Sequence, residues 1–567
     1  MAASFFALAA IGFWTPAWMD PSVTGYGDWQ FFHNQWEAGR VAVTRWGEFP
    51  LWNAFNCGGI TIWGNPQNQT LSPFFWLSPL LGSTLAIKIH LVAHAFIGML
   101  GMYAFGRREA RLSAVPSALA AVAWGCSGTF AWDGGGGHST FLGFWLLPLL
   151  LYSFRRAAED PRWASVVAGV FAAMLIDGAT YVPAYAVLVL AFDGLVRLGA
   201  FRSRRGLVRS ALIAGPLALM LGAIRAYPSL LTVRRNPRED LSRVPDSVDL
   251  AELFEMLTAR EHEWRWGHEF VWPEYGAFVG YTVVALGVVG LVLSLRRGRA
   301  WLSLGAIVFG AYTLGNSGDY APWTLTQFLP IYDNLRVPSR FAVVFLLYFC
   351  LAAGVTLEAI QKLLSRWRFW KVAVPVLILV GAGTDIFIVN IDTSALWGGD
   401  AIYADDPFGK YFVEGAAHHS RSYASLPQRN HGTRYCREAV FIRVPRGIWE
   451  GNEPQVRLAG DGAILRDWDR TANSVWAEVE VSEPTVMTIN QRWDWDWVSS
   501  VGTVIDEGGL LAVRLPAGRH RVEVRYAPRE IPWLVTLMVL GMVLALLNWR
   551  FGTDARWSAL GRRILRR

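Results

Sequence analysis

The sequence predicts a mainly α-helical, polytopic membrane protein with a β-rich domain before its last helix. The chain has 567 residues, is 53% hydrophobic and 17% charged, and has a mean hydropathy of +0.27. This composition lies outside the usual range of soluble domains. Several stretches approach the roughly 20 apolar residues that cross about 30 Å of hydrocarbon. Four of them are residues 85–105, 276–295, 341–360 and 372–389.

The first span is predicted at residues 1–18. This segment lacks the basic start and the A-x-A pattern of a cleaved secretory signal, and Asp-Pro-Ser follows it. We therefore expect an uncleaved helix.

Arginine and lysine clusters in short loops set the expected topology. The clusters are Arg107, Arg108 and Arg111; Arg155, Arg156 and Arg162; Arg197, Arg202, Arg204 and Arg205; Arg296, Arg297 and Arg299; Lys362, Arg366, Arg368 and Lys371; and the tail GRRILRR. The positive-inside rule makes these loops cytoplasmic. An even number of crossings between successive clusters gives about twelve spans with both termini in the cytoplasm. The net charge of +7 is then explained by these cytoplasmic loops and does not indicate nucleic-acid binding.

The region 163–195 tests this topology because basic clusters flank it on both sides. An even number of crossings requires a hairpin here, and Asp177-Gly178 is a natural turn pair. We expect Asp177 at the outer membrane surface.

A separate β-rich domain is predicted at residues 391–530. The stretches SVWAEVEVSEPTVMTINQRW and GGLLAVRLPAGRHRVEVRYAP alternate apolar and polar residues, with Pro and Gly at the breaks, as half-buried antiparallel strands do. The predicted organisation is a transmembrane domain at residues 1–390, whose first extracytoplasmic loop is residues 19–82, then the β-rich domain, then a last helix and basic tail at residues 531–567.

The four cysteines show no metal-ligand spacing and imply no disulfide framework. Cys57 and Cys436 can pair if both face an oxidising compartment.

Asp28 is the first candidate for chemistry, because it lies in an aromatic and amide-rich stretch just after the first span. The residues predicted to bind substrate beside it are Tyr26, Trp29, Gln30, His33 and Asn34. A carboxylate partly shielded from water can serve as a general base. The alternative is a helix cap, since Gly-Asp before a helical run is an ordinary N-cap pattern.

The rest of the first loop offers indoles and amides that suit a sugar ring, whose faces stack on aromatics while its hydroxyls take hydrogen bonds. The candidates are Trp52, Asn53, Asn65 and Gln67. An interfacial aromatic belt is the alternative, in a chain with 29 Trp.

The stretch WDGGGGHS supplies Asp133 and His138 in a glycine-rich turn whose backbone amides can approach a phosphate. Without a Lys it is no P-loop, and a helix-capping His138 is the alternative reading.

Arginines on the expected outer face run against the charge bias of that face. Arg225, Arg336 and Arg340 are candidates for binding a lipid phosphate, because guanidinium groups match phosphate bidentately. Salt bridges to Glu239, Asp240 or Asp333 and contacts with lipid headgroups are the alternatives. The chain has no H-E-x-x-H, G-x-S-x-G, nucleotide-binding or zinc pattern, which disfavours a membrane protease, a lipase and an ATP-driven pump.

The chain resembles the YfhO family of bacterial multi-pass membrane proteins, within the GT-C class of glycosyltransferases. The resembling stretches are GYGDWQ, GEFPLWNAFNCGG, NPQNQTLSPFFW, GGGGHSTFLGFWLLPLLLY, LGAIRAYPSLLTVRRNPR, EYGAFVGYTVVALGVVGL, FLPIYDNLRVPSRF and RLPAGRHRVEVRYAP. They follow one another in order over nearly the whole chain. The stretch RWDWDWVSS at residues 492–500 and the segment 391–472 depart from the pattern and receive no role.

The resemblance implies a GT-C-like fold and an enzyme of the bacterial cytoplasmic (inner) membrane. It would transfer a sugar from a polyprenyl-phosphate donor to an envelope glycan or glycopolymer on the extracytoplasmic face, with Asp28 as the base. Some members of the class use a divalent ion and others do not. Asp28 and Asp133 can share one, such as Mg²⁺ or Mn²⁺, but no spacing in the sequence decides this. The alternative is a non-catalytic scaffold or translocation partner in envelope glycan assembly. Secondary transport is a third hypothesis, which would require acids inside the spans.

Overall fold

The computed structural model describes most of the chain. The described residues are 2–20, 22–25, 27–178, 180–199, 204–237, 246–262, 268, 270–296, 298–394, 407–415, 421–438 and 440–552.

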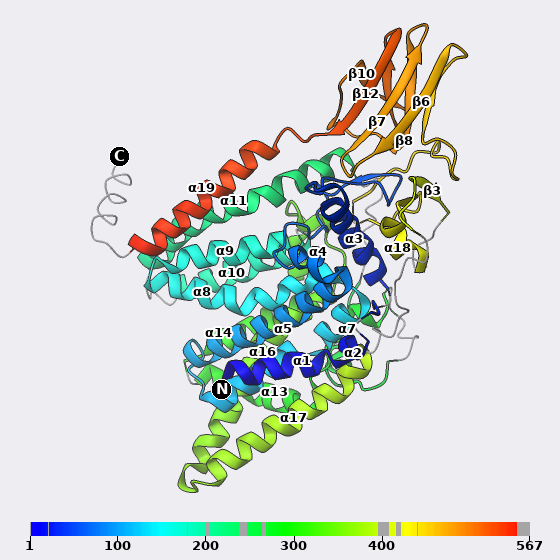
Figure 1. The fold of residues 1–567 in the computed structure, drawn as a ribbon. Coiled ribbons are helices and arrows are strands. Elements are labelled where there is room, and N and C mark those ends of the chain that lie inside the picture. The colour runs from blue at the N-terminus through cyan, green and yellow to red at the C-terminus, as the bar shows by residue number, and fades with distance from the viewer. Residues whose placement is uncertain are drawn as a thin grey trace, which may run out of the picture.

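A bundle of helices forms the larger part of the molecule (Figure 1). Its helices are α1 (Ala2–Phe13), α5 (Ser83–Arg108), α6 (Ala114–Gly125), α7 (Gly128–Gly136), α8 (Leu147–Glu159), α9 (Trp163–Ile176), α10 (Tyr181–Gly199), α11 (Arg204–Arg235), α13 (Gly280–Arg296), α14 (Ala300–Thr313), α16 (Ala342–Leu363), α17 (Trp370–Ser394) and α19 (Ile531–Phe551). The four stretches predicted as spans lie in α5, α13, α16 and α17. Figure 1 shows the start of α1 and the end of α19 at the same end of the bundle.

Seven helical stretches of the described residues are long and apolar enough to cross a membrane: residues 83–108, 114–136, 181–199, 204–235, 338–366, 370–393 and 531–551. Four shorter apolar helices, α1, α9, α13 and α14, accompany them. The chain is therefore a multi-pass membrane protein, and the count of twelve spans stays a prediction.

Helix α16 lies at the centre of the bundle, with 89% of its most apolar stretch buried. Its neighbour α13 approaches it closely at Gly290, where an added Cβ would lie 1.9 Å from the carbonyl oxygen of Ala352. Small residues allow such backbone contact between membrane helices, where dispersion forces replace the hydrophobic effect.

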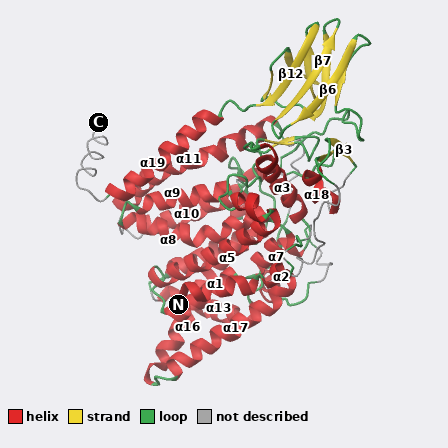
Figure 2. Ribbon diagram, viewed as in Figure 1, coloured by secondary structure: helices red, strands yellow, loops and turns green. Residues whose placement is uncertain are grey.

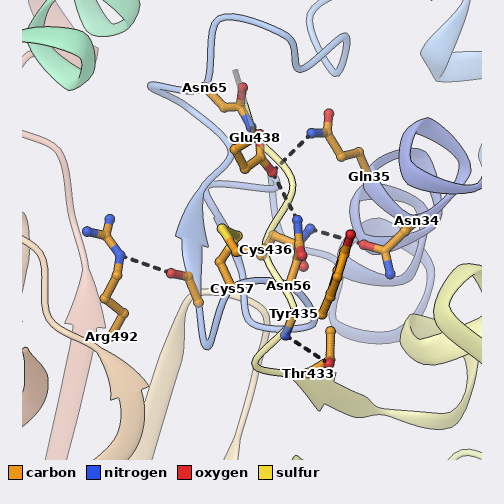
Figure 3. Close-up of a disulfide and its surroundings, with 12 residues drawn as sticks. Asn34, Gln35, Asn56, Cys57, Asn65, Thr433, Tyr435, Cys436, Glu438 and Arg492 are labelled. Atoms are coloured by element: carbon orange, nitrogen blue, oxygen red, sulfur yellow. Dashed lines mark hydrogen bonds between the residues drawn. A yellow bond between two sulfur atoms is a disulfide. The ribbon is translucent and has the colours of Figure 1, made fainter. Parts of the chain in front are cut away.

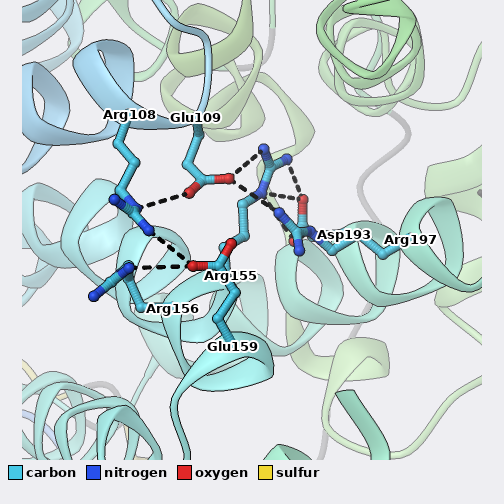
Figure 4. Close-up of polar contacts among 7 residues, drawn as sticks. All are labelled: Arg108, Glu109, Arg155, Arg156, Glu159, Asp193 and Arg197. Carbon is cyan, nitrogen blue, oxygen red and sulfur yellow. Dashed lines mark hydrogen bonds and ion pairs between the residues drawn. The ribbon is translucent and has the colours of Figure 1, made fainter. Parts of the chain in front are cut away.

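An ionic network joins α5, α8 and α10 near their C-terminal ends (Figure 4). Arg155 and Asp193 form its centre and are 4% and 1% exposed in their side chains. Arg197 lies 3.7 Å from Asp193 and 3.0 Å from Glu109, and Arg155 also stacks on the ring of Trp301. Asp193 lies within α10, near its C-terminal end. Its arginine partners neutralise it, so it offers no support for the transport hypothesis.

A two-sheet β-sandwich precedes α19, as the alternating stretches predict (Figure 2). Its strands are β5 (Val456–Leu458), β6 (Ala463–Arg470), β7 (Ser474–Val481), β8 (Thr485–Arg492), β9 (Trp497–Ser499), β10 (Thr503–Glu507), β11 (Leu510–Leu515) and β12 (Gly518–Tyr526). The sheets have the orders β10-β11-β8-β5 and β6-β7-β12-β9. Consecutive strands β7 and β8 lie in different sheets, as do β11 and β12. Each alternating stretch therefore supplies one strand to each sheet.

A smaller layer connects the sandwich to the bundle. It contains β3 (Phe412–Glu414), α18 (Arg421–Arg429) and β4 (His431–Thr433), with β3 and β4 paired in parallel. Helix α18 packs against α3 (Trp29–Trp46), where the Asn34 amide donates to the carbonyl oxygen of Tyr423 at 2.9 Å. The first loop is thus enclosed by chain from the C-terminal part of the protein.

The turn between α9 and α10 lies at Asp177, as predicted. Its place at the outer membrane surface stays a prediction, and the residue itself is only 4% exposed. Its carboxylate turns inward to the imidazoles of His90 and His94 on α5.

Candidate functional site

Asp28 lies directly before α3, and its main chain is fixed to the end of α7. The Asp28 amide donates to the carbonyl oxygen of Gly136 at 3.0 Å. Gly27 has φ +67°, and an added Cβ there would lie 2.7 Å from the same oxygen. The glycine therefore permits the close approach that places Asp28 beside α7.

The Asp28 carboxylate does not cap α3, although the residue occupies the N-cap position. Its Oδ1 lies 2.9 Å from Nη2 of Arg437, and its Oδ2 lies 4.0 Å from Nε2 of His138. The side chains of Asp28 and Arg437 are 23% and 45% exposed. Asp28 therefore lies between two basic groups on a face that is accessible to solvent.

His138 is held by Asp133 through both main chain and side chain. The His138 amide donates to the Asp133 carbonyl oxygen at 2.8 Å, and Nδ1 lies 3.0 Å from Asp133 Oδ1. The imidazole does not cap the following helical turn. Burial works against protonation of the ring, but the hydrogen bond to Asp133 and the nearby Glu274 charge outweigh it, so the pKa of His138 is raised. The raised pKa favours an imidazolium facing Asp28.

Arg340 and Glu274 form a second ion pair near His138. The guanidinium donates to both Glu274 oxygens, at 2.7 and 2.6 Å. Arg340 also stacks on the rings of Tyr181 and Phe141. Burial opposes ionisation of Glu274, but the charges of Arg340 and His138 prevail and lower its pKa. The salt-bridge alternative is therefore right for Arg340, with a partner that the sequence did not suggest.

A small cavity lies beside this pair, lined among others by Asp133, Glu274, Tyr275 and Arg340. This is room for about one water molecule.

A disulfide joins the first loop to the segment that carries Arg437 (Figure 3). The pairing of Cys57 with Cys436, which the sequence allowed, is present. Main-chain hydrogen bonds from Cys57 to Tyr435 and from Gly58 to Thr433 run beside it. Arg437 follows the second cysteine directly, so the disulfide fixes the position of the chain that brings it to Asp28.

Glu438 is fastened to the first loop by three amides. Gln35 and Asn56 donate to its Oε1 at 3.4 and 2.9 Å, and Asn65 donates to its Oε2 at 2.8 Å (Figure 3). Burial raises the pKa of Glu438 to about 8, although all three amides favour the ionised form. Together with the disulfide, this cluster fixes both sides of Arg437.

Most other candidates of the first loop form the framework of the site. The Trp29 indole is buried and donates to the Gly134 carbonyl oxygen, and the Trp52 indole is buried and donates to Gln491. Four more candidates make hydrogen bonds within the protein. These bonds join His33 to Thr84, the Asn53 side chain to the main-chain N–H of Phe55, Asn65 to Glu438, and Asn34 to the carbonyl oxygen of Tyr423. The main-chain N–H of Gln67 donates to Asn65 Oδ1. In this structure the side-chain contacts occupy most of the groups that the sequence suggested for sugar binding.

Arg225 has an internal role as well. It is 0% exposed and donates to the carbonyl oxygens of Trp63 and Asn65 at 3.2 and 3.0 Å. Arg336 is half-buried, and it forms no ion pair among the described residues. Gln30 has a buried Oε1 with no hydrogen-bond partner in the described part of the chain. Tyr26, Glu239 and Asp240 lie outside the described residues.

Sequence reasoning missed Glu274, Arg437 and Glu438. Glu274 stands in the aromatic stretch VWPEYG on the expected outer face, which resembles the surroundings that singled out Asp28. Arg437 and Glu438 follow a cysteine whose possible partner lies in the first loop. That pairing was the signal that could have found them.

The described residues contain one group suited to a metal ion by proximity, His90, His94 and Asp177, and Asp28 and Asp133 are not in it. The sharing of a divalent ion by Asp28 and Asp133 stays a prediction. In this structure the His138 ring lies between the two carboxylates, with Nδ1 hydrogen-bonded to Asp133 and Nε2 facing Asp28.

Comparison with protein-family models gives no match, and comparison with curated proteins gives none. Among solved structures, arabinofuranosyltransferase AftD from Mycobacteria matches with a TM-score of 0.51 and 18% identity, over 78% of this chain and 32% of AftD. This chain therefore spans about a third of the length of AftD. An oligosaccharyltransferase from Archaeoglobus fulgidus matches with a TM-score of 0.41 and 13% identity, over 77% of this chain and 63% of that protein. The likeness to AftD concerns the fold alone. With its multi-pass helical bundle and C-terminal β-rich region, this chain has the GT-C-like fold that its sequence predicts.

Proposed function

We propose that the protein is a membrane glycosyltransferase that moves a sugar from a polyprenyl-phosphate donor to an envelope glycan or glycopolymer. The observation that carries the proposal is the position of Asp28. The carboxylate lies on an accessible face between Arg437 and His138, in a GT-C-like fold. An acid flanked by cations suits a reaction in which a hydroxyl loses a proton while a phosphate leaves.

In the proposed reaction Asp28 accepts the proton of an acceptor hydroxyl. The hydroxyl oxygen forms a bond to the anomeric carbon, and the bond from that carbon to the phosphate oxygen breaks. The electron pair of the broken bond stays on the phosphate, which leaves on its polyprenyl chain. Asp28 must exchange its contact with Arg437 for the acceptor, and the released guanidinium is then available to the phosphate.

His138 supports this step through its charge. Its raised pKa favours the imidazolium, which stabilises negative charge on the phosphate or on Asp28. Asp133 fixes the ring through Nδ1, and the Glu274–Arg340 pair lies behind it. Asp133 and Arg340 are positioning residues in this scheme.

The surroundings of the reaction are part of the proposal. By the positive-inside rule, the basic clusters of the sequence favour a cytoplasmic position for the end of the bundle opposite Asp28. The site would then lie on the extracytoplasmic side of a bacterial cytoplasmic membrane, with both termini in the cytoplasm. The YfhO resemblance belongs to the same proposal.

An assay of the purified protein with synthetic undecaprenyl-phosphate sugars and envelope glycan acceptors tests the function. Wild type should transfer sugar, and Asp28→Asn should lose about 10²–10⁴-fold in rate at unchanged membrane abundance. Asp20→Asn is the matched control, because Asp20 is an exposed acid of the same loop with Ser22 as its partner.

Absence of transfer and hydrolysis with every donor would contradict the enzyme proposal. Full activity of Asp28→Asn would contradict the role of the carboxylate. Loss of envelope glycan in cells without any transfer by the purified protein would favour the non-catalytic component of glycan assembly.

A further inference from the structure

His90, His94 and Asp177 form a buried cluster that the proposed reaction does not use. The two histidines lie one turn apart on α5, and Asp177 follows the last residue of α9. Nε2 of His94 lies 2.9 Å from Asp177 Oδ2, and Nε2 of His90 lies 3.3 Å from Oδ1. The three residues are 1%, 2% and 4% exposed. Two imidazole nitrogens thus face the two oxygens of one carboxylate in the interior.

The protons of these groups do not account for the arrangement. His94 Nδ1 lies 3.0 Å from the carbonyl oxygen of His90, which can only accept, so Nδ1 carries a proton. In the neutral ring Nε2 then presents a lone pair to a carboxylate oxygen at 2.9 Å. Two lone pairs at this distance repel each other, so a positive charge is required between them.

The contact between His90 and Asp177 is the weaker of the two. Nε2 of His90 lies 3.3 Å from Asp177 Oδ1, and neither atom makes a well-aligned hydrogen bond among the described residues. Buried polar atoms without partners are costly. One metal ion can coordinate both imidazole Nε2 atoms and an oxygen of Asp177 at the same time.

We infer that His90, His94 and Asp177 bind a divalent metal ion of the zinc type. Two imidazoles and one carboxylate are a ligand set of Zn²⁺, with bonds of about 2.0–2.2 Å. One ligand atom from each of the three residues lies within 4.8 Å of the other two, which is close enough for one ion to contact all three after a small adjustment. The hydrogen bond of His94 Nδ1 to a backbone carbonyl is the usual outer contact of a metal-bound histidine. Mg²⁺ prefers oxygen ligands, so the imidazoles disfavour it.

Aromatic rings shield the cluster. Phe74 stacks on His90 with ring centroids 4.8 Å apart, and the Trp36 ring lies 5.7 Å from His90. Such a shell excludes water and strengthens the attraction between a cation and its ligands.

The cluster also connects to the candidate active site. The Gln69 amide donates to the carbonyl oxygens of both Asp177 and Ser139, at 2.8 and 3.1 Å. Ser139 follows His138. The metal would therefore fasten α5 to the turn between α9 and α10, beneath the chain segment that carries His138. This is a structural role, and it does not depend on the proposed transfer reaction.

Metal analysis of the full-length protein tests the inference. The protein is purified in detergent by a tag without histidines and without chelators, and its metal content is measured by mass spectrometry. Wild type should hold about one equivalent of zinc, and His94→Gln and Asp177→Asn should each hold less than a tenth of that. His33→Gln is the matched control, because His33 is a buried histidine that contacts Thr84 on the same helix α5. It should keep the metal.

Spectroscopy keeps the test decisive if a variant fails to fold. Wild type stripped by chelator should lose several degrees of melting temperature, and added Zn²⁺ should restore them. Reconstitution with Co²⁺ should give the visible absorption of a tetrahedral site, and X-ray absorption should show two imidazoles. Monodisperse wild type without bound metal, with no thermal response to Zn²⁺ or Co²⁺, would overturn the inference and leave an imidazolium–carboxylate pair.

Discussion

Nη2 of Arg437 lies 2.9 Å from Oδ1 of Asp28, although the two residues are far apart in the sequence. Arg437 follows a disulfide-bonded cysteine, and Asp28 directly precedes α3. A contact with an exposed guanidinium is weak and exchangeable. The proposed base is therefore held by a partner that substrate can displace.

Replacement of Arg437 should mainly weaken donor binding. We expect Arg437→Gln to raise the KM for the lipid-linked donor by about 10-fold or more, because a charge-assisted contact to phosphate is lost. Arg437→Lys should recover part of the effect. Arg434→Gln, in the same segment and exposed, is the control. An unchanged KM in Arg437→Gln would contradict its role at the phosphate.

The pH dependence should report His138. Its pKa is raised above the ordinary value of 6.5, so the imidazolium is fully present below 6.5 and is lost as the pH rises through the higher folded-state pKa. We expect kcat/KM to fall over that higher range. His138→Asn should be slower and should lack this descending limb. A profile of identical shape in the variant would show that another group titrates.

Loss of the disulfide should loosen the site. Cys57→Ser with Cys436→Ser should lower the melting temperature, with a cost of about 2–5 kcal/mol by analogy with small secreted domains. The segment 433–438 loses its covalent attachment, so transfer should fall as well. Thermal unfolding with and without a phosphine reductant measures the effect. The double variant should no longer respond to the reductant, and an equal response would show that other groups are involved.

The Glu274–Arg340 pair should be required as a unit. Arg340→Met leaves the Glu274 carboxylate buried without its cation and should cost about 3–5 kcal/mol of stability. The double variant Glu274→Gln, Arg340→Met should regain most of this loss, because no uncompensated charge remains. Thermal unfolding of wild type, Glu274→Gln, Arg340→Met and the double variant gives the coupling energy between the two residues. Additive effects would contradict the pairing.

The sequence predicted the parts of this protein that depend on local patterns. Apolar length predicted α5, α13, α16 and α17, and period-two alternation predicted strands β7, β8, β11 and β12 of the sandwich. Asp28 was identified as a candidate general base because an acid in an aromatic segment just after a membrane span is locally unusual.

Contacts between distant segments were beyond those patterns. The structure brings Asp28, Asp133, His138 and Arg340 into one region, but it pairs Arg340 with Glu274 and buries Trp52 and Arg225 in the framework. An indole suits a sugar face and a packed interface equally well, so composition alone could not decide between them.

The sequence by itself determined that this chain enters a membrane many times, where it carries a β-rich domain, and which acid of its first loop stands out. Only the tertiary structure decided what lies beside that acid, and that Asp177 turns inward to two histidines. The physical reason is that hydrophobic length and periodicity are read within one helix or strand. The pairing of charges depends on which elements pack together, and a disulfide and interhelical contacts fix that in space.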